Sequence, residues 1–217
     1  MGFKRNLIAG EIIGQLLDIA VHENCEVHNA VYMGMGEPLM NEEAVYKSAL
    51  LMHHPLGRNM GARRITISTC GLPDGIKRLA GWELDVTLAV SLHAPDDVLR
   101  SKLMPINDRY PLSELIDACR QYCEATSNRI TFEYVMIKGV NMEAGTAQKL
   151  RRLLEGIPCN INLIPVNPGL HGFASPSEGE QIRFAAALER AGLDAVIRRE
   201  RGADICGACG QLAGDMT

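Results

Sequence analysis

The sequence lacks any apolar run approaching the roughly 20 residues of a membrane-spanning helix. Residues 1–6 also lack an apolar segment behind their basic side chains, so they do not have the pattern of a secretory signal. There is no excess of positive charge either: the net charge is −4 at pH 7, which does not indicate a nucleic-acid-binding protein. Any basic surface must be local, and the candidates are Arg63-Arg64, Arg151-Arg152 and Arg198-Arg199 with Arg201.

Cysteines at paired spacings are scarce as well. The chain has seven cysteines, an odd number, and this usage is typical of a reducing cytosol rather than of a disulfide scaffold. We therefore expect a cytoplasmic protein with no membrane partner. No linker, internal repeat or low-complexity segment divides the chain. Its 217 residues, 47% hydrophobic and 22% charged, predict a single α/β domain over residues 1–217, with a cysteine-containing loop at about 200–217.

Helical and strand patterns alternate along the chain. Apolar runs predict strands at residues 30–35, 64–69, 86–92, 130–137, 160–165 and 195–199. Helices are expected at residues 7–22, after a cap at Asn41, from Pro111 onward, at 144–154, and from a Ser177–Glu180 capping box to about 191. This order predicts an α/β fold, an incomplete barrel of five parallel strands plus a final C-terminal strand.

The first helix has no strand before it. Either the fold begins with a helix, or a first strand is missing from the chain. Within the helix that Pro111 opens, Cys119 and Cys123 share an apolar face with leucine and isoleucine, so we expect both thiols in the core.

Four polar motifs stand where strands are expected to end. They are Gly34-Met35-Gly36-Glu37-Pro38, Ser68-Thr69-Cys70-Gly71, Ser91-Leu92-His93-Ala94-Pro95 and Pro165-Val166-Asn167-Pro168. Because an α/β barrel carries its chemistry at the C-terminal ends of its strands, the recurrence predicts one shared ligand pocket.

The first motif combines flexibility with charge. Gly36 lets the backbone approach a ligand closely, and the Glu37 carboxylate would suit an ammonium group. A plain β-to-α turn would explain the same residues. The motif is not a dinucleotide-binding fingerprint, because the third glycine at the required spacing is absent.

The other three motifs offer neutral polar groups. Hydroxyls of Ser68 and Ser91 can hold a carboxylate or a ribose, and the His93 imidazole either contacts a ligand or is structural. Asn167 lies in a turn made rigid by Pro165 and Pro168, where it binds a ligand or simply completes the turn.

The last motif contains Cys206 and Cys209 in a C-x-x-C spacing, which has three interpretations. A zinc site would need a second ligand pair, and none has suitable spacing. A thioredoxin-like redox pair would be expected after the first strand of a βαβ unit. The third interpretation is a single reactive thiol, Cys209, on a glycine-flanked loop whose nearby arginines favour the thiolate.

Taken together, these motifs resemble the radical S-adenosylmethionine (SAM) RNA methyltransferases that modify C2 of an adenine in 23S rRNA and, in many bacteria, an adenine in tRNA. The resemblance covers nearly the whole chain. The matching segments are residues 2–7, 33–39, 61–69, 91–95, 103–107, 132–134, 162–167 and 209–212.

The resemblance implies a partial radical-SAM barrel and a set of roles. Gly36 and Glu37 would hold the SAM amino group. Cys209 would first accept a methyl group, before a radical generated at a 4Fe-4S cluster passes that carbon to the adenine ring. The remaining residues that would line the SAM pocket are Ser68, Ser91, Leu92, His93 and Asn167. A flavodoxin-like protein would be the reductant.

The chain departs from the family pattern in two ways. Cys70 stands where the family pattern has serine, and we expect only local retuning. The cluster-binding C-x-x-x-C-x-x-C, which in the family precedes the segment matching residues 2–7, is absent, so the chain itself supplies no metal ligands. We therefore expect an N-terminally truncated and inactive chain whose strand at 30–35 has an open edge. The alternatives are a clusterless SAM- or RNA-binding module, and a redox or zinc protein built on Cys206 and Cys209.

Overall fold

The computed structural model describes residues 3–167 and 172–198. Its strands are β1 (Ala30–Tyr32), β2 (Ile65–Thr69), β3 (Thr87–Ser91), β4 (Ile130–Met136), β5 (Cys159–Pro165) and β6 (Ala195–Ile197). Its helices are α1 (Ala9–His22), α2 (Glu42–His53), α3 (Pro73–Leu79), α4 (Asp97–Leu103), α5 (Leu112–Thr126), α6 (Thr146–Leu153) and α7 (Glu178–Arg190). Three short 3₁₀ helices are η1 (Pro38–Met40), η2 (Ala62–Arg64) and η3 (Pro105–Asp108). Within this described part, every helix is too short or too polar to cross a bilayer.

The strand order of the sheet is β1-β2-β3-β4-β5-β6. The pairs β1–β2, β2–β3 and β5–β6 are parallel, as predicted for strands linked by helices. The α/β class and all the predicted strands are therefore confirmed. Strand β1 ends at Tyr32, short of the predicted residue 35, and helices α3 and α4 are absent from the sequence-based prediction.

The chain divides into two compact units. The N-terminal unit comprises Phe3–Ser91 and Tyr110–Ile130, and the C-terminal unit comprises Leu92–Arg109 and the described residues from Thr131 onward.

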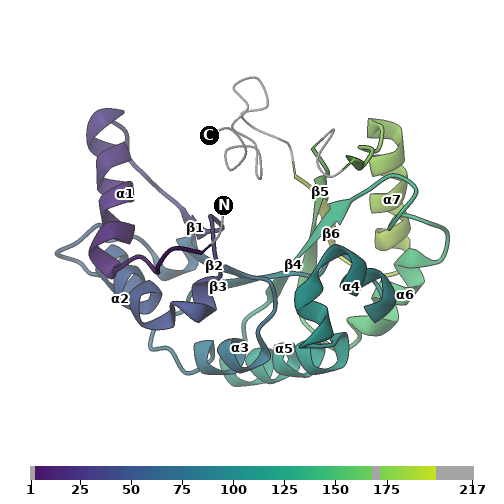
Figure 1. Cartoon of the computed structure of the whole chain (residues 1–217), viewed down its shortest axis with the longest axis horizontal. Coiled ribbons are helices and arrows are strands. Elements are labelled where there is room, and N and C mark those ends of the chain that lie inside the picture. Colours follow the sequence, from purple (N-terminus) through teal and green to yellow (C-terminus); the bar gives the residue numbers. More distant parts are fainter. Residues whose placement is uncertain (1–2, 168–171, 199–217) are drawn as a thin grey trace. The chain divides into compact units, whose positions relative to one another are not determined.

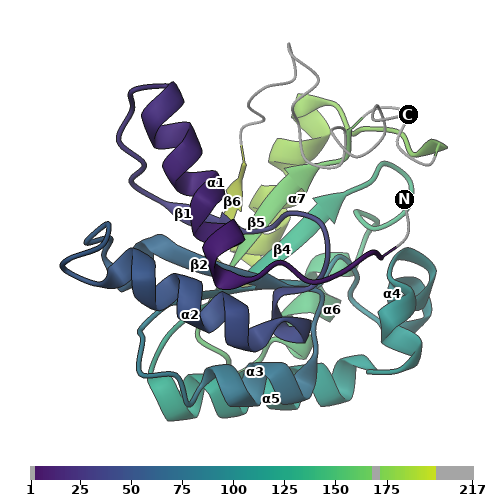
Figure 2. The same ribbon diagram turned by 60° about the vertical axis from the view of Figure 1, so that its left-hand side comes forward.

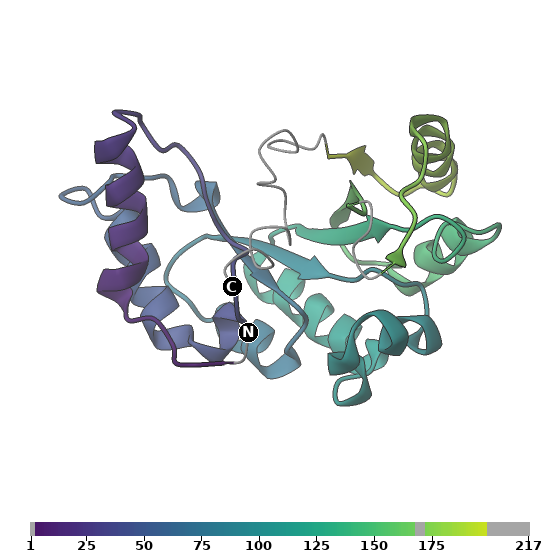
Figure 3. The ribbon, with the colours of Figure 1, turned by 45° about the horizontal axis from the view of Figure 1, so that its top comes forward.

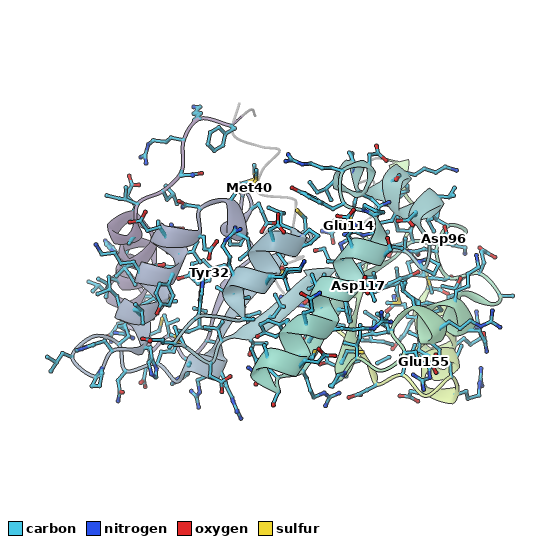
Figure 4. The ribbon with its side chains drawn as sticks, turned by 90° about the horizontal axis from the view of Figure 1, so that it is seen from below. Tyr32, Met40, Asp96, Glu114, Asp117 and Glu155 are labelled. Atoms are coloured by element: carbon cyan, nitrogen blue, oxygen red, sulfur yellow. The ribbon has the colours of Figure 1, made fainter. Side chains whose placement is uncertain are left out.

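In the N-terminal unit, α3 and α5 run side by side (Figure 2). Helix α5 buries the face predicted for it, which includes Cys119 and Cys123. The hydroxyl of Tyr122 on this face donates to the Val86 carbonyl at 3.4 Å and so ties the helix to the chain entering β3. Glu114 and Asp117 lie on the exposed face of α5 (Figure 4). Burial of apolar side chains on one face of the helix thus holds it in place.

Strand β1 lies at the end of the strand order, and among the described residues it pairs with β2 alone. Val31 at its centre is 52% exposed, so the predicted open edge at this strand is confirmed. Tyr32, labelled in Figure 4, joins β1 to α2: its hydroxyl lies 2.6 Å from the Ser48 hydroxyl.

The predicted cap at Asn41 is wrong in its chemistry. Asn41 occupies the position before α2, but its side chain makes no capping hydrogen bond. Instead its amide donates to the Leu7 carbonyl at 2.8 Å, close to the start of α1. A tertiary contact therefore displaces the local cap that the sequence favours.

In the C-terminal unit, α6 and α7 lie beside one another, and α7 runs along β6 (Figures 1 and 3). The ring of Tyr134 on β4 packs against that of Phe184 on α7 with centroids 5.7 Å apart. The capping box that begins α7 is confirmed: Glu180 Oε2 accepts from the Ser177 backbone at 2.7 Å.

Candidate functional site

The loop after β1 presents the first predicted site residues. Gly36 has φ +88°, and a side chain there would meet open space, so the backbone is bare at this point. Half-buried Glu37 accepts hydrogen bonds from the Cys70 backbone through Oε2 (2.8 Å) and from the Leu39 backbone through Oε1 (3.1 Å). Each oxygen of an ionised carboxylate can accept a second bond, so an ammonium group can still bind. The bond to Cys70 uses its backbone, so it does not depend on a thiol at that position.

Ser68, near the end of β2, is only 8% exposed. Its hydroxyl makes no hydrogen bond to any of residues 3–167 or 172–198. The oxygen is not among the buried unpartnered side-chain atoms of residues 3–167 and 172–198, so it keeps contact with solvent, from which a polar group of a ligand can take over its hydrogen bond. The neighbouring Thr69 differs, because its hydroxyl accepts from the Gly71 backbone at 3.1 Å and serves the turn.

Hydrogen bonds fix the backbone N–H and carbonyl groups of Leu92 and His93 in the turn after β3. The backbone N–H groups of Leu92 (3.0 Å) and His93 (3.4 Å) both donate to the Glu133 carbonyl. The Leu92 carbonyl accepts from Nε of Arg100 at 3.3 Å. The His93 carbonyl accepts from the side-chain amide of Asn141 at 3.0 Å. Leu92 itself is fully buried, whereas Ser91 and His93 are partly exposed.

His93 is neutral at physiological pH. Burial, reinforced by the positive charge of Arg100, lowers the pKa of His93 to about 4. Its Nδ1 lies 3.1 Å from the Val135 backbone nitrogen, and because that N–H only donates, Nδ1 must accept. The proton of the neutral ring therefore resides on Nε2, and an interaction of the ring with the Glu133 carbonyl partly opposes the lowering of the pKa.

Of the remaining predicted site residues, the structure describes Asn167 but not the two cysteines of the last motif. Asn167 is half-buried and follows Val166, whose N–H donates to the Met136 carbonyl at 3.1 Å, so the loop after β5 is tied to the end of β4. Cys206 and Cys209 lie outside the described residues.

Three groups around these strand ends were missed by sequence reasoning: Glu133, Asn141 and Arg100. Glu133 in β4 is 5% exposed and accepts from the Asn162 amide of β5 at 2.8 Å, and burial raises its pKa. A carboxylate inside an apolar strand was the available signal. Asn141 and Arg100 gave no such signal, since each lies in an ordinary polar context in the sequence.

A cavity of about 330 Å³ lies elsewhere, between α6, α7 and the loop after β4. Lys138, Gln148 and Arg183 are among its lining residues, and none of the predicted site residues within 3–167 borders it. The cavity therefore does not bear on the motifs at the strand ends.

The parallel strands and the polar strand ends are those of the radical SAM superfamily, whose family model matches residues 2–150. The chain belongs to this superfamily, which implies SAM and a 4Fe-4S cluster as cofactors.

More particular relatives are RNA methyltransferases by name. The chain is 48% identical over 211 residues to a probable dual-specificity RNA methyltransferase RlmN of Thermotoga petrophila, covering 97% of this chain and 62% of that protein. It is 47% identical over 218 residues to the protein of the same name from Thermus thermophilus, covering 98% and 61%. The crystal structure of a radical SAM methyltransferase from Sphaerobacter thermophilus superposes with a TM-score of 0.92 at 49% identity, covering 97% of this chain and 63% of that one. The chain thus spans about three-fifths of the length of the relatives it matches.

The described residues fit the two cofactors differently. The open space at Gly36, the spare acceptor capacity of Glu37 and the Ser68 hydroxyl suit the amino and hydroxyl groups of SAM. The described residues do not fit a 4Fe-4S cluster. Over residues 3–167 and 172–198, no three cysteine, histidine or acidic side chains come together as metal ligands.

Proposed function

We propose that this chain carries the SAM-binding region and the methyl-accepting cysteine of a radical SAM RNA methyltransferase. Its target is C2 of an adenine in 23S rRNA, with an adenine of tRNA as a second substrate. The observation that carries the proposal is 48% identity, over 97% of the chain, to a relative named as a probable dual-specificity RNA methyltransferase.

In this proposal Gly36 and Glu37 bind the SAM amino group. The residues that line the rest of its site are Ser68, Ser91, Leu92, His93 and Asn167. The assignment is supported by the Ser68 hydroxyl, for which residues 3–167 and 172–198 give no hydrogen-bond partner, and by neutral His93, whose ring proton lies on Nε2.

Cys209 accepts the methyl group. Its thiolate Sγ forms a bond to the methyl carbon of SAM, the bond from that carbon to the sulfonium sulfur breaks, and S-adenosylhomocysteine leaves. The thiol proton goes to solvent.

Transfer of the carbon to RNA requires the 4Fe-4S cluster, for which the described residues offer no ligands. We therefore also propose that the isolated chain does not methylate RNA, and that a flavodoxin-like reductant serves the full-length enzyme. Anaerobic reconstitution of the chain should give no stoichiometric iron–sulfur absorbance, and its appearance would refute the proposed inactivity.

SAM binding tests the site directly. Isothermal titration of the full chain with SAM should show one site, which Ser68→Ala and Glu37→Ala weaken. Removing a hydrogen bond to a charged ligand group costs about 1.5–3 kcal/mol, or roughly ten- to a hundredfold in affinity. Glu114→Ala, on the exposed face of α5, is the matched control and should bind as the wild type does. Equal binding by all four proteins would place SAM elsewhere.

A chimera tests the reaction. The N-terminal part of the Thermotoga petrophila relative, joined ahead of this chain, should methylate C2 of adenine in 23S rRNA, measured by mass spectrometry of the nucleosides. Cys209→Ser should abolish the product, whereas Cys206→Ser should retain it. Equal damage by both substitutions would favour a functional cysteine pair, and an inactive chimera whose chain binds SAM would favour a binding module.

A further inference from the structure

His93 has an unusual backbone conformation. Its φ is +59°, in the left-handed region that glycine and asparagine occupy far more readily than histidine. The other non-glycine residues with positive φ among the described residues are Asn24, Asn59 and Ser127, of which the first two are asparagines and the third ends α5. A strained residue of this kind persists only when its surroundings hold it.

Hydrogen bonds from Asn141 hold the backbone of His93 in this conformation. It is 1% exposed, and its side-chain amide donates to the carbonyls of His93 (3.0 Å) and Val135 (2.6 Å). Its Oδ1 accepts from the Ile137 N–H at 2.8 Å. The amide thus uses both its donors and its acceptor to join the turn after β3 to the end of β4.

The backbone of Asn141 is itself held by a buried tyrosine. Its own carbonyl accepts from the Tyr134 hydroxyl at 2.6 Å, and Tyr134 is fully buried. Val135 links Asn141 to the ring of His93. Its carbonyl accepts from the Asn141 amide, and its N–H donates to Nδ1 of His93. Asn141 therefore constrains both the backbone and the ring of His93, the first directly and the second through Val135.

We propose that Asn141 is a positioning residue, which holds His93 in its left-handed conformation and thereby fixes the direction of the imidazole Nε2–H for SAM. The proposal rests on the proposed SAM-binding function. Asn141 itself does not touch the ligand in this account; it acts through His93.

The test is a set of variants of the full chain titrated with SAM. Asn141→Ala should weaken SAM binding about tenfold, which corresponds to about 1.4 kcal/mol. Leu188→Ala removes a fully buried apolar side chain of α7 that cannot hydrogen-bond to the turn, so it lowers stability without disturbing His93. It should leave the affinity within about twofold of the wild type, a change well below one hydrogen bond. If Asn141→Ala binds SAM no worse than Leu188→Ala, the proposal is overturned.

A second pair of variants separates positioning from general stabilisation. Glycine adopts positive φ without strain, so a chain with His93→Gly needs no clamp at that position. The loss of urea stability caused by Asn141→Ala should therefore be smaller in the His93→Gly background than in the wild type. An equal loss in both backgrounds means that Asn141 does not hold His93, and it overturns the proposal.

The ring provides a readout independent of SAM. Nitrogen-15 NMR should show Nδ1 of His93 unprotonated and Nε2 protonated in the wild type, and a mixture of tautomers in Asn141→Ala. If the wild type fails to bind SAM, the proposed function fails, but the NMR spectra and the urea cycle still decide whether Asn141 positions His93. An unchanged tautomer would count against it.

Discussion

The neutral state of His93 makes the stability of the fold depend on pH. Its pKa is lowered from 6.5 to about 4 in the folded chain by burial and by Arg100. Below pH 6.5 the unfolded chain binds a proton at this residue and the folded chain does not. The contribution of His93 is therefore complete above pH 6.5 and is lost as pH falls toward 4. The difference between the two pKa values corresponds to a loss of about 3 kcal/mol.

Urea unfolding followed by far-ultraviolet circular dichroism, at a series of pH values from neutral to 4, measures this loss. The matched variant is His93→Asn, because asparagine tolerates positive φ and its side-chain oxygen can accept the Val135 N–H, yet it does not titrate. Carboxylates such as Glu11 and Glu180 titrate alike in both proteins. The wild type should therefore lose about 3 kcal/mol more than His93→Asn over this range. Parallel curves for the two proteins would refute the lowered pKa of His93.

Three further predictions concern other elements. Glu37→Ala should lower the free energy of unfolding by about 2 kcal/mol, because two backbone N–H groups lose a charged acceptor; wild-type stability in urea would contradict this. Glu133→Gln should stabilise the chain at pH 7 and lose that advantage in acid, because burial raises the pKa of Glu133 and its ionised form is disfavoured in the fold; urea titrations that show no gain at neutral pH would argue against it. The exposed edge of β1 should promote self-association in light scattering, and Val31→Lys should reduce it, whereas a monomeric wild type would rule it out.

The strands and the capping box could be predicted because their causes are local. Residues Val86-Thr87-Leu88-Ala89-Val90, which contain most of β3, form a nearly continuous apolar run, and such runs mark strands buried on both faces. Ser177 and Glu180 satisfy each other's backbone across three residues, so the start of α7 is specified within its own sequence. Similar reasoning placed the apolar face of α5, where Cys119 and Cys123 are buried.

The features that sequence reasoning missed depend on contacts between distant residues. Asn41 has the chemistry of a cap, but the Leu7 carbonyl, 34 positions away, takes its amide. Helix α4 spans only seven residues, too short for a clear helical period, and its Arg100 is fully buried because Asn107 and the Leu92 carbonyl accept from its guanidinium. The sequence alone gives no way to pair these groups.

The site residues could be located at strand ends, but their readiness for a ligand follows from the structure. Glu37, after β1, accepts from the backbone N–H of Cys70, which follows β2. His93, after β3, accepts from the backbone N–H of Val135 in β4. One polar atom of Glu37 is thus bonded to the residue that follows β2, and one of His93 to β4. In each case both partners belong to the same compact unit. What remains is spare acceptor capacity on an anionic carboxylate and a donor on a neutral imidazole. A fixed acceptor and a fixed donor lose little conformational entropy when a ligand binds, so this anchoring favours a polar ligand over an apolar one.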